Sequence, residues 1–141
     1  MMTVRTYRDL RVWQTGMDLV VGVYDLTRSL PKSEIYGLSS QLQRAAVSVP
    51  ANIAEGHTRN HLREYLQFLS IARSSLAEVA SYLELIERLS YAPAERTQPL
   101  LDLTSSLNRQ LLALRDSLST RLQEDPFPYD STFPSPDTPT P

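Results

Sequence analysis

The residues best suited to metal chemistry are two histidines that lie four positions apart. His57 and His61 would share one helical face with Glu64 nearby, a spacing that occurs in zinc sites. The chain has no other histidine and no cysteine, so it falls short of a zinc ligand set. Because residues 56–60 have the composition of a turn, we interpret both histidines as solvated turn residues and predict no metal and no cofactor.

Groups for acid–base or nucleophilic catalysis lack the companions that they need. Glu55, Glu64 and Glu78 have no histidine or lysine partner in the pattern, so surface or capping roles are favoured. The serines of the helical segments have no Gly-x-Ser-x-Gly turn and no triad companion. Only four glycines are present, and they form no phosphate-binding loop. We therefore predict that the chain is not an enzyme and has no small-molecule substrate.

Arginines offer a different chemistry, because the planar guanidinium group binds phosphate in a bidentate manner. Every basic residue except Lys32 is an arginine. Four of them fall in two consecutive helical segments and the turn between them, which would gather them into a nucleic-acid-binding patch: Arg44, Arg59, Arg63 and Arg73. The net charge of −2 gives no general attraction for nucleic acid. Solvated helix faces with local ion pairs are the alternative interpretation.

Helices must position these residues, and the apolar spacing predicts four of them. Apolar side chains recur at steps of three and four residues over about 9–30, 38–56, 62–89 and 100–118. Short connections favour antiparallel neighbours, so the predicted fold is an all-α, up-down-up-down four-helix bundle. Thr58 or Asn60 is expected to cap the third helix. Pro50 either kinks or breaks the second helix.

Composition divides the chain into a bundle domain, residues 1–124, and a tail, residues 125–141. The tail holds six prolines among Ser, Thr and Asp, a composition that predicts disorder. It carries three aspartates and no basic residue. No segment is apolar enough for a signal peptide or a membrane span, so we expect a cytoplasmic protein without a membrane partner.

The third helix is apolar on more than one face. One row of its residues has the spacing of a buried core. A second, largely apolar row is more than a peripheral helix of a small monomer needs. We predict that this row forms an oligomer interface through Phe68, Ile71, Tyr82, Leu85 and Leu89.

The segment AAVSVPANIAEG, residues 45–56, resembles the signature of four-helix-bundle proteins encoded in intervening sequences of 23S ribosomal RNA. These proteins are related to the accessory variability determinant of diversity-generating retroelements. The similarity extends over about residues 7–90, and its most specific positions are Trp13, Pro50, Asn52, Glu55 and Gly56.

The resemblance implies a kinked second helix at Pro50, a homopentamer and no enzymatic activity. Its retroelement relatives imply RNA or a nucleic-acid enzyme as a partner. We therefore hypothesise a homo-oligomeric assembly or accessory factor that contacts structured RNA. The alternative is a protein-interaction module that docks a different protein through its apolar helix face or its proline-rich tail.

Overall fold

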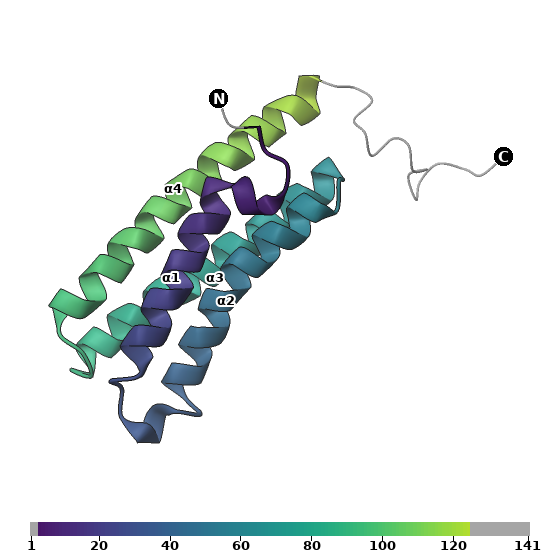
Figure 1. Ribbon diagram of the computed structural model, residues 1–141. Helices are drawn as coiled ribbons and strands as arrows, with labels where there is room; N and C mark the ends of the chain where they lie inside the picture. Colours follow the sequence, from purple (N-terminus) through teal and green to yellow (C-terminus); the bar gives the residue numbers. More distant parts are fainter. Residues whose placement is uncertain (1–2, 125–141) are drawn as a thin grey trace.

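The computed structural model describes residues 3–124, and all regular structure within them is helical (Figure 1). The four long helices are α1 (Arg11–Thr27), α2 (Leu38–Thr58), α3 (Leu62–Arg88) and α4 (Ala94–Glu124). Two short 3-10 helices, η1 (Tyr7–Asp9) and η2 (Lys32–Glu34), precede α1 and α2. The predicted all-α class is confirmed, whereas the predicted disorder of residues 125–141 lies outside the described residues.

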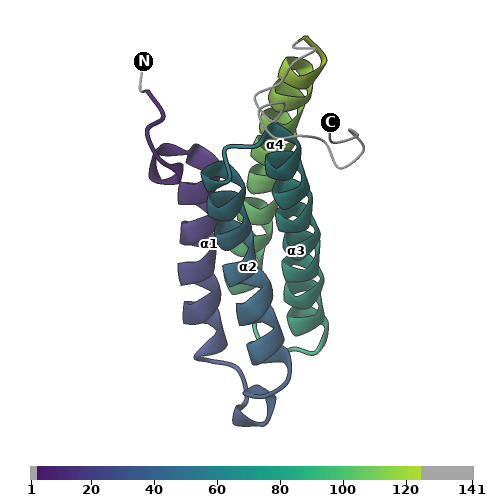
Figure 2. The same ribbon diagram turned by 90° about the vertical axis from the view of Figure 1, so that its right-hand side faces the viewer.

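Each helix packs against its neighbours in sequence, and α1 also packs against α4, which closes the bundle. Figures 1 and 2 show that consecutive helices run in opposite directions. No close backbone contact joins α1 to α3 or α2 to α4, so these pairs occupy opposite corners of the bundle. This arrangement is the four-helix bundle that the sequence predicts.

All four helices contribute to one apolar core. The three- and four-residue spacing places one stripe of each helix inside, where burying a large aliphatic side chain stabilises the fold by roughly 1.5–3 kcal/mol. The largest fully buried side chains are those of Leu19, Val23, Leu26, Leu42, Val49, Ile53, Leu69, Val79, Leu83, Ile86, Leu107 and Leu111. No helix within residues 3–124 has the length and apolarity that crossing a membrane requires.

The first helix is shorter than the predicted span of 9–30. Leu10 adopts an extended conformation (φ −75°, ψ 129°) and separates η1 from α1. Thr6 and Asp9 do form a capping box, but it caps η1. At the other end α1 stops at Thr27, and the Ser29 hydroxyl donates to the carbonyl oxygen of Leu26 (2.8 Å).

Pro50 lies inside α2, which continues through it without interruption. The alternative of a broken helix is therefore wrong, and the kink stays a prediction. The turn between α2 and α3 also differs from expectation. Thr58 is the last residue of α2, and Asn60 adopts a left-handed conformation (φ 57°). His61 precedes α3 without a side-chain capping bond, so neither expected residue caps this helix.

Candidate oligomer and nucleic-acid interfaces

Glycine and proline in α2 set how closely this helix approaches its neighbours. Pro50 is buried, and a Cβ on Gly16 of α1 would lie 3.4 Å from the Pro50 Cβ. A Cβ on Gly56 would lie only 2.7 Å from the Phe68 Cβ and 3.1 Å from Cδ1 of Tyr65, both on α3. The absence of a side chain at Gly56 is what allows α2 and α3 to pack at this distance.

The polar residues of the α2 motif are held by bonds within the bundle. The Asn52 amide donates to the carbonyl oxygen of Ser48 (2.7 Å) and to its hydroxyl oxygen (2.9 Å). The same hydroxyl shares a hydrogen bond of 2.8 Å with Ser75 of α3. Glu55 pairs with Arg59 one turn later (3.0 Å). These contacts give the motif a structural role, because the bond between Ser48 and Ser75 ties the turn around Pro50 to α3 and the others hold the side chains of α2 in place.

The histidine pair that the sequence offers for metal chemistry is split between two elements. His57 lies in the last turn of α2 and meets the Tyr65 ring edge-on, with ring centroids 5.8 Å apart. His61 lies in the connection before α3. Within residues 3–124 no three His, Asp or Glu side chains are grouped so that they could hold a metal ion.

Exposed apolar side chains gather on three of the four helices. We define the outer face as the seven large apolar residues that stay exposed on α1, on α2 and on α3 with its C-cap residue: Met17, Val21, Tyr24, Val47, Ile71, Leu85 and Leu89. Among the described residues of α4 no large apolar side chain is exposed to this degree. The outer face therefore spans α2, which lies at the corner opposite α4, and its two neighbours α1 and α3.

Small and polar residues of α2 leave hollows between the flanking stripes of the outer face. A hollow of about 410 Å³ lies between Tyr24 of α1 and the α2 residues Arg44 and Val47. A second, of about 320 Å³, lies between Arg44 and the α3 residues Glu78 and Tyr82. The face thus offers both apolar ridges and recesses, the relief that interdigitating side chains need.

The predicted interface row of α3 is only part of this face. Ile71, Leu85 and Leu89 are exposed, whereas Phe68 and Tyr82 are half-buried toward α2. Sequence reasoning missed the stripe of α1, because Met17 and Tyr24 fall in a row whose spacing also fits a buried core. The signal that points to it is Val21, which lies outside both core rows of α1 and is 68% exposed.

The four arginines of the predicted patch do not form a single cluster. Arg59 and Arg63 lie at the turn between α2 and α3, and the Arg59 guanidinium stacks over the Phe68 ring at 5.4 Å. Arg44 lines the hollows of the outer face. Arg73 faces α4, where its Nε donates to Asn108 Oδ1 (3.3 Å). The turn therefore brings together two of the four.

Folding separates the charges of a nearly neutral chain along the bundle axis. Three contacts between helices lie at about the same height along the bundle axis, so they mark a plane that divides the bundle in two. Gly16 lies against Pro50, Ser48 is hydrogen-bonded to Ser75, and Arg73 is hydrogen-bonded to Asn108. On the side of the α2–α3 turn, residues 3–18, 48–75 and 108–124 carry nine basic and six acidic side chains, a net charge of +3. The remaining described residues, 19–47 and 76–107, carry five basic and seven acidic ones, a net charge of −2. We call these parts the basic half and the acidic half.

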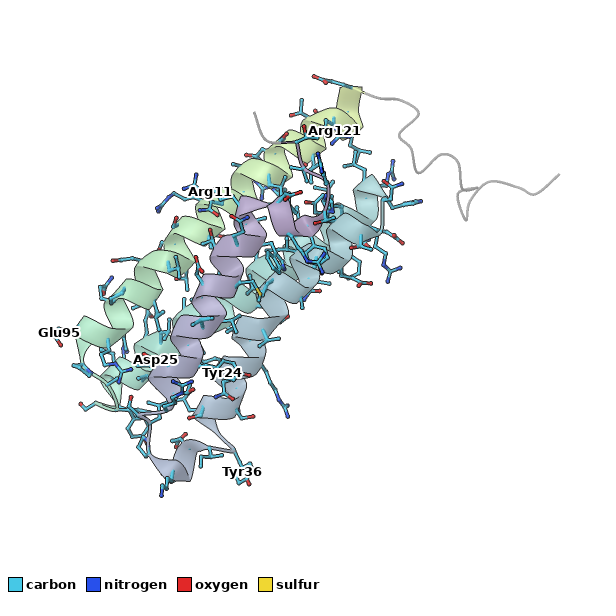
Figure 3. All side chains as sticks on the ribbon, viewed as in Figure 1. Arg11, Tyr24, Asp25, Tyr36, Glu95 and Arg121 are labelled. Carbon is cyan, nitrogen blue, oxygen red and sulfur yellow. The ribbon has the colours of Figure 1, made fainter. Side chains whose placement is uncertain are left out.

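In Figure 3 the labelled Arg11 and Arg121 lie in the basic half, and Asp25 and Glu95 lie in the acidic half. The basic half joins arginines that are far apart in sequence: Arg5, Arg8, Arg11, Arg59, Arg63, Arg73, Arg109, Arg115 and Arg121. Sequence reasoning missed those of the N-terminal segment and of α4, because only the antiparallel fold brings them to one end.

The N-terminal segment of the basic half is an ordered turn. The backbone N–H groups of Arg5 and Thr6 donate to the Asp9 carboxylate at 2.9 and 3.3 Å, and these bonds lower the pKa of Asp9 below its ordinary value. The ring of Tyr7 meets the ring of Trp13 edge-on, with centroids 5.4 Å apart. The Arg8 guanidinium lies over the Tyr7 ring, 4.7 Å from its centroid. The turn thereby holds Arg8 beside α1.

Comparison with known proteins connects this bundle to one family. The family model described as 23S rRNA-intervening sequence protein matches residues 8–113. The chain belongs to this family. The matched region covers α1, α2 and α3 and reaches into α4, so it includes the α2 motif and the whole outer face.

A solved structure supports the fold. The crystal structure of a protein with unknown function from the S23 ribosomal protein family of Bacteroides thetaiotaomicron is 23% identical to this chain. The similarity covers 74% of this chain and 95% of that protein, with a TM-score of 0.69. No curated protein matches the sequence. The similar structure therefore supports the four-helix bundle and assigns no activity to the family member described here.

Proposed function

We propose that this protein is a non-enzymatic, homo-oligomeric bundle that serves as an assembly or accessory factor for structured RNA. The observation that carries the proposal is the outer face. Large apolar side chains exposed on the helices lie on α1, α2 and α3, and within the described residues none lies on α4. Scattered exposed apolar residues are ordinary on a monomer, whereas stripes on adjacent helices mark an interface.

The proposed oligomer forms when the outer faces of neighbouring copies pack together. The interface row predicted on α3 contributes one edge of this contact, and the stripe on α1 contributes the other. A ring needs two different surface patches on each subunit, because each copy contacts one neighbour on either side. Stripes on two separate helices supply such patches, and the family resemblance sets the expected number of subunits at five.

Sedimentation velocity and native mass spectrometry test the oligomer. We expect a species of five times the chain mass of 16.0 kDa. Val21→Lys and Leu85→Lys each place a charge in the proposed interface and should dissociate it while the helices stay folded. Ala113→Lys adds the same charge at an exposed position of α4 and should leave it intact. A wild-type monomer at micromolar concentration would reject the proposal and favour docking of a different protein.

The proposed RNA contact uses the basic half. In a ring of side-by-side subunits related by rotation, all basic halves lie on the same side, so the positive charge of each copy adds to one rim. Arginine side chains there would neutralise phosphates and release counterions. The family description names 23S rRNA, which makes a structured fragment of ribosomal RNA the first probe to use.

RNA titrations at several salt concentrations test this contact. Binding should weaken steeply as salt rises, and the Arg59→Ala, Arg63→Ala double variant should bind less tightly with a shallower salt dependence. Arg28→Ala with Arg88→Ala removes two exposed arginines from the acidic half and serves as the control. Binding that does not depend on salt, or that weakens equally in both double variants, would reject the basic half as the RNA surface.

A further inference from the structure

We propose that the acidic segment after α4, residues 125–141, binds the basic half of its own bundle and competes there with RNA. The fold dictates where this segment starts. Figures 1 and 2 show that α4 ends at the same end of the bundle as η1 and the α2–α3 turn. Asp125 therefore follows directly on the last residue of the basic half, Glu124.

Charge complementarity favours this partner. Residues 125–141 hold Asp125, Asp130 and Asp137 and no Lys, Arg or His, so their side-chain charge of −3 opposes the +3 of the basic half. Several arginines of the basic half form no ion pair with any described residue, and Arg5, Arg8, Arg11 and Arg121 are among them. They come from the N-terminal turn, the start of α1 and the end of α4. These arginines are available to the carboxylates of the attached segment.

Aromatic residues strengthen the match. Arginines of the basic half already stack on rings, since Arg8 lies over Tyr7 and Arg59 over Phe68. The segment brings three more rings, Phe127, Tyr129 and Phe133, between its aspartates. An arginine that contacts a carboxylate and a neighbouring ring gains both an ion pair and a cation–π contact.

Covalent attachment makes this modest attraction effective. At about 3.3–3.6 Å per extended residue, seventeen residues are long enough to reach every arginine at this end of the bundle. A short tether gives its end an effective concentration in the millimolar range. RNA must therefore displace an acidic segment that never diffuses away. Binding of residues 125–141 to the basic half does not depend on the proposed RNA function. Only the competition between this segment and RNA rests on that function.

Energy transfer tests the docking in the full chain. Trp13 is the only tryptophan and lies in the basic half, and the absence of cysteine lets one fluorophore be attached at Thr138→Cys. Transfer from Trp13 should be high at low salt and should fall as salt rises. Asp125→Asn, Asp130→Asn and Asp137→Asn together should lower it severalfold at low salt. Equal transfer in the parent and this triple variant, or transfer unaffected by salt, would overturn the proposal.

Two controls show whether the segment docks on the basic half and on its own bundle. Glu84→Gln, Glu95→Gln and Asp102→Asn remove three exposed carboxylates from the acidic half and should leave the transfer unchanged. Chains with Trp13→Phe that carry the fluorophore can be mixed with unlabelled chains that keep Trp13. If this mixture reproduces all of the transfer, the segment binds a neighbouring copy and the proposal fails.

RNA titration then tests the competition. The triple tail variant should bind a ribosomal RNA fragment severalfold more tightly than wild type at low salt, and the acidic-half control should not. Equal affinity of the tail variant and wild type would overturn the competition. If no variant binds RNA, the RNA contact of the proposed function fails, while the energy transfer still decides whether the segment docks.

Discussion

Gly56→Ala should destabilise the bundle, although alanine is the better helix former. The added Cβ would lie 2.7 Å from the Phe68 Cβ, an atom fixed to the α3 backbone, so only a shift between α2 and α3 relieves the clash. Overpacking of this kind costs about 1–3 kcal/mol. The helix-propensity gain of alanine over glycine offsets at most about 1 kcal/mol of it.

Gly16→Ala is the matched control, because its Cβ would meet Pro50 at 3.4 Å, an ordinary van der Waals distance. This variant should be as stable as wild type or slightly more stable. In urea unfolding at equal protein concentration, the Gly56→Ala variant should lie at least about 1 kcal/mol below the Gly16→Ala variant, a difference of roughly 4 °C in Tm. A Gly56→Ala variant as stable as its control would refute the close approach of α2 and α3.

Three further predictions concern the core, the polar cluster and the N-terminal turn. Leu111→Ala removes a fully buried side chain of α4 and should cost about 2–5 kcal/mol in thermal or urea unfolding. Ser75→Ala removes the bond to Ser48 and should cost about 1 kcal/mol in urea unfolding. Because the folded pKa of Asp9 is lowered, its bonds stabilise the turn at neutral pH and are lost as pH falls through that pKa. Trp13 fluorescence should report this acid transition, which Asp9→Asn should abolish.

The four helices were predictable from sequence because their apolar spacing is regular over long segments. Pro50 was different, since local propensity alone leaves a break and a kink equally open. The structure excludes the break, because α2 continues through Pro50, whose ring packs beside Gly16 of α1. The prediction that Thr58 or Asn60 caps α3 was wrong. Asn60 adopts the left-handed conformation that typically follows the end of a helix, here α2, and so it does not serve as the N-cap of α3.

The candidate interfaces were less predictable, because both are assembled from several helices. A three- and four-residue row shows that a face is apolar, but it does not show which neighbour covers that face. Met17 and Tyr24 therefore fit the pattern of core residues in the sequence. Only the packing of α1 against α2 and α4 shows that both side chains are exposed. The arginine positions predicted a patch of four at the α2–α3 turn but not the basic half, since the basic half combines three segments separated by about 30 residues each.

Antiparallel topology explains how a nearly neutral chain acquires a polar axis. With four helices running up and down, the N-terminal segment, the α2–α3 turn and the end of α4 meet at one end of the bundle, so a basic bias in each of them adds instead of cancelling. The same topology places Glu124, the residue that precedes the acidic segment 125–141, at this end. The proposed association through the outer face would run along the sides of the helices and leave the ends of the bundle uncovered. The proposed self-assembly and polyanion binding would therefore use different parts of one small bundle, and substitutions such as Leu85→Lys on the outer face and Arg59→Ala at the α2–α3 turn should affect them independently.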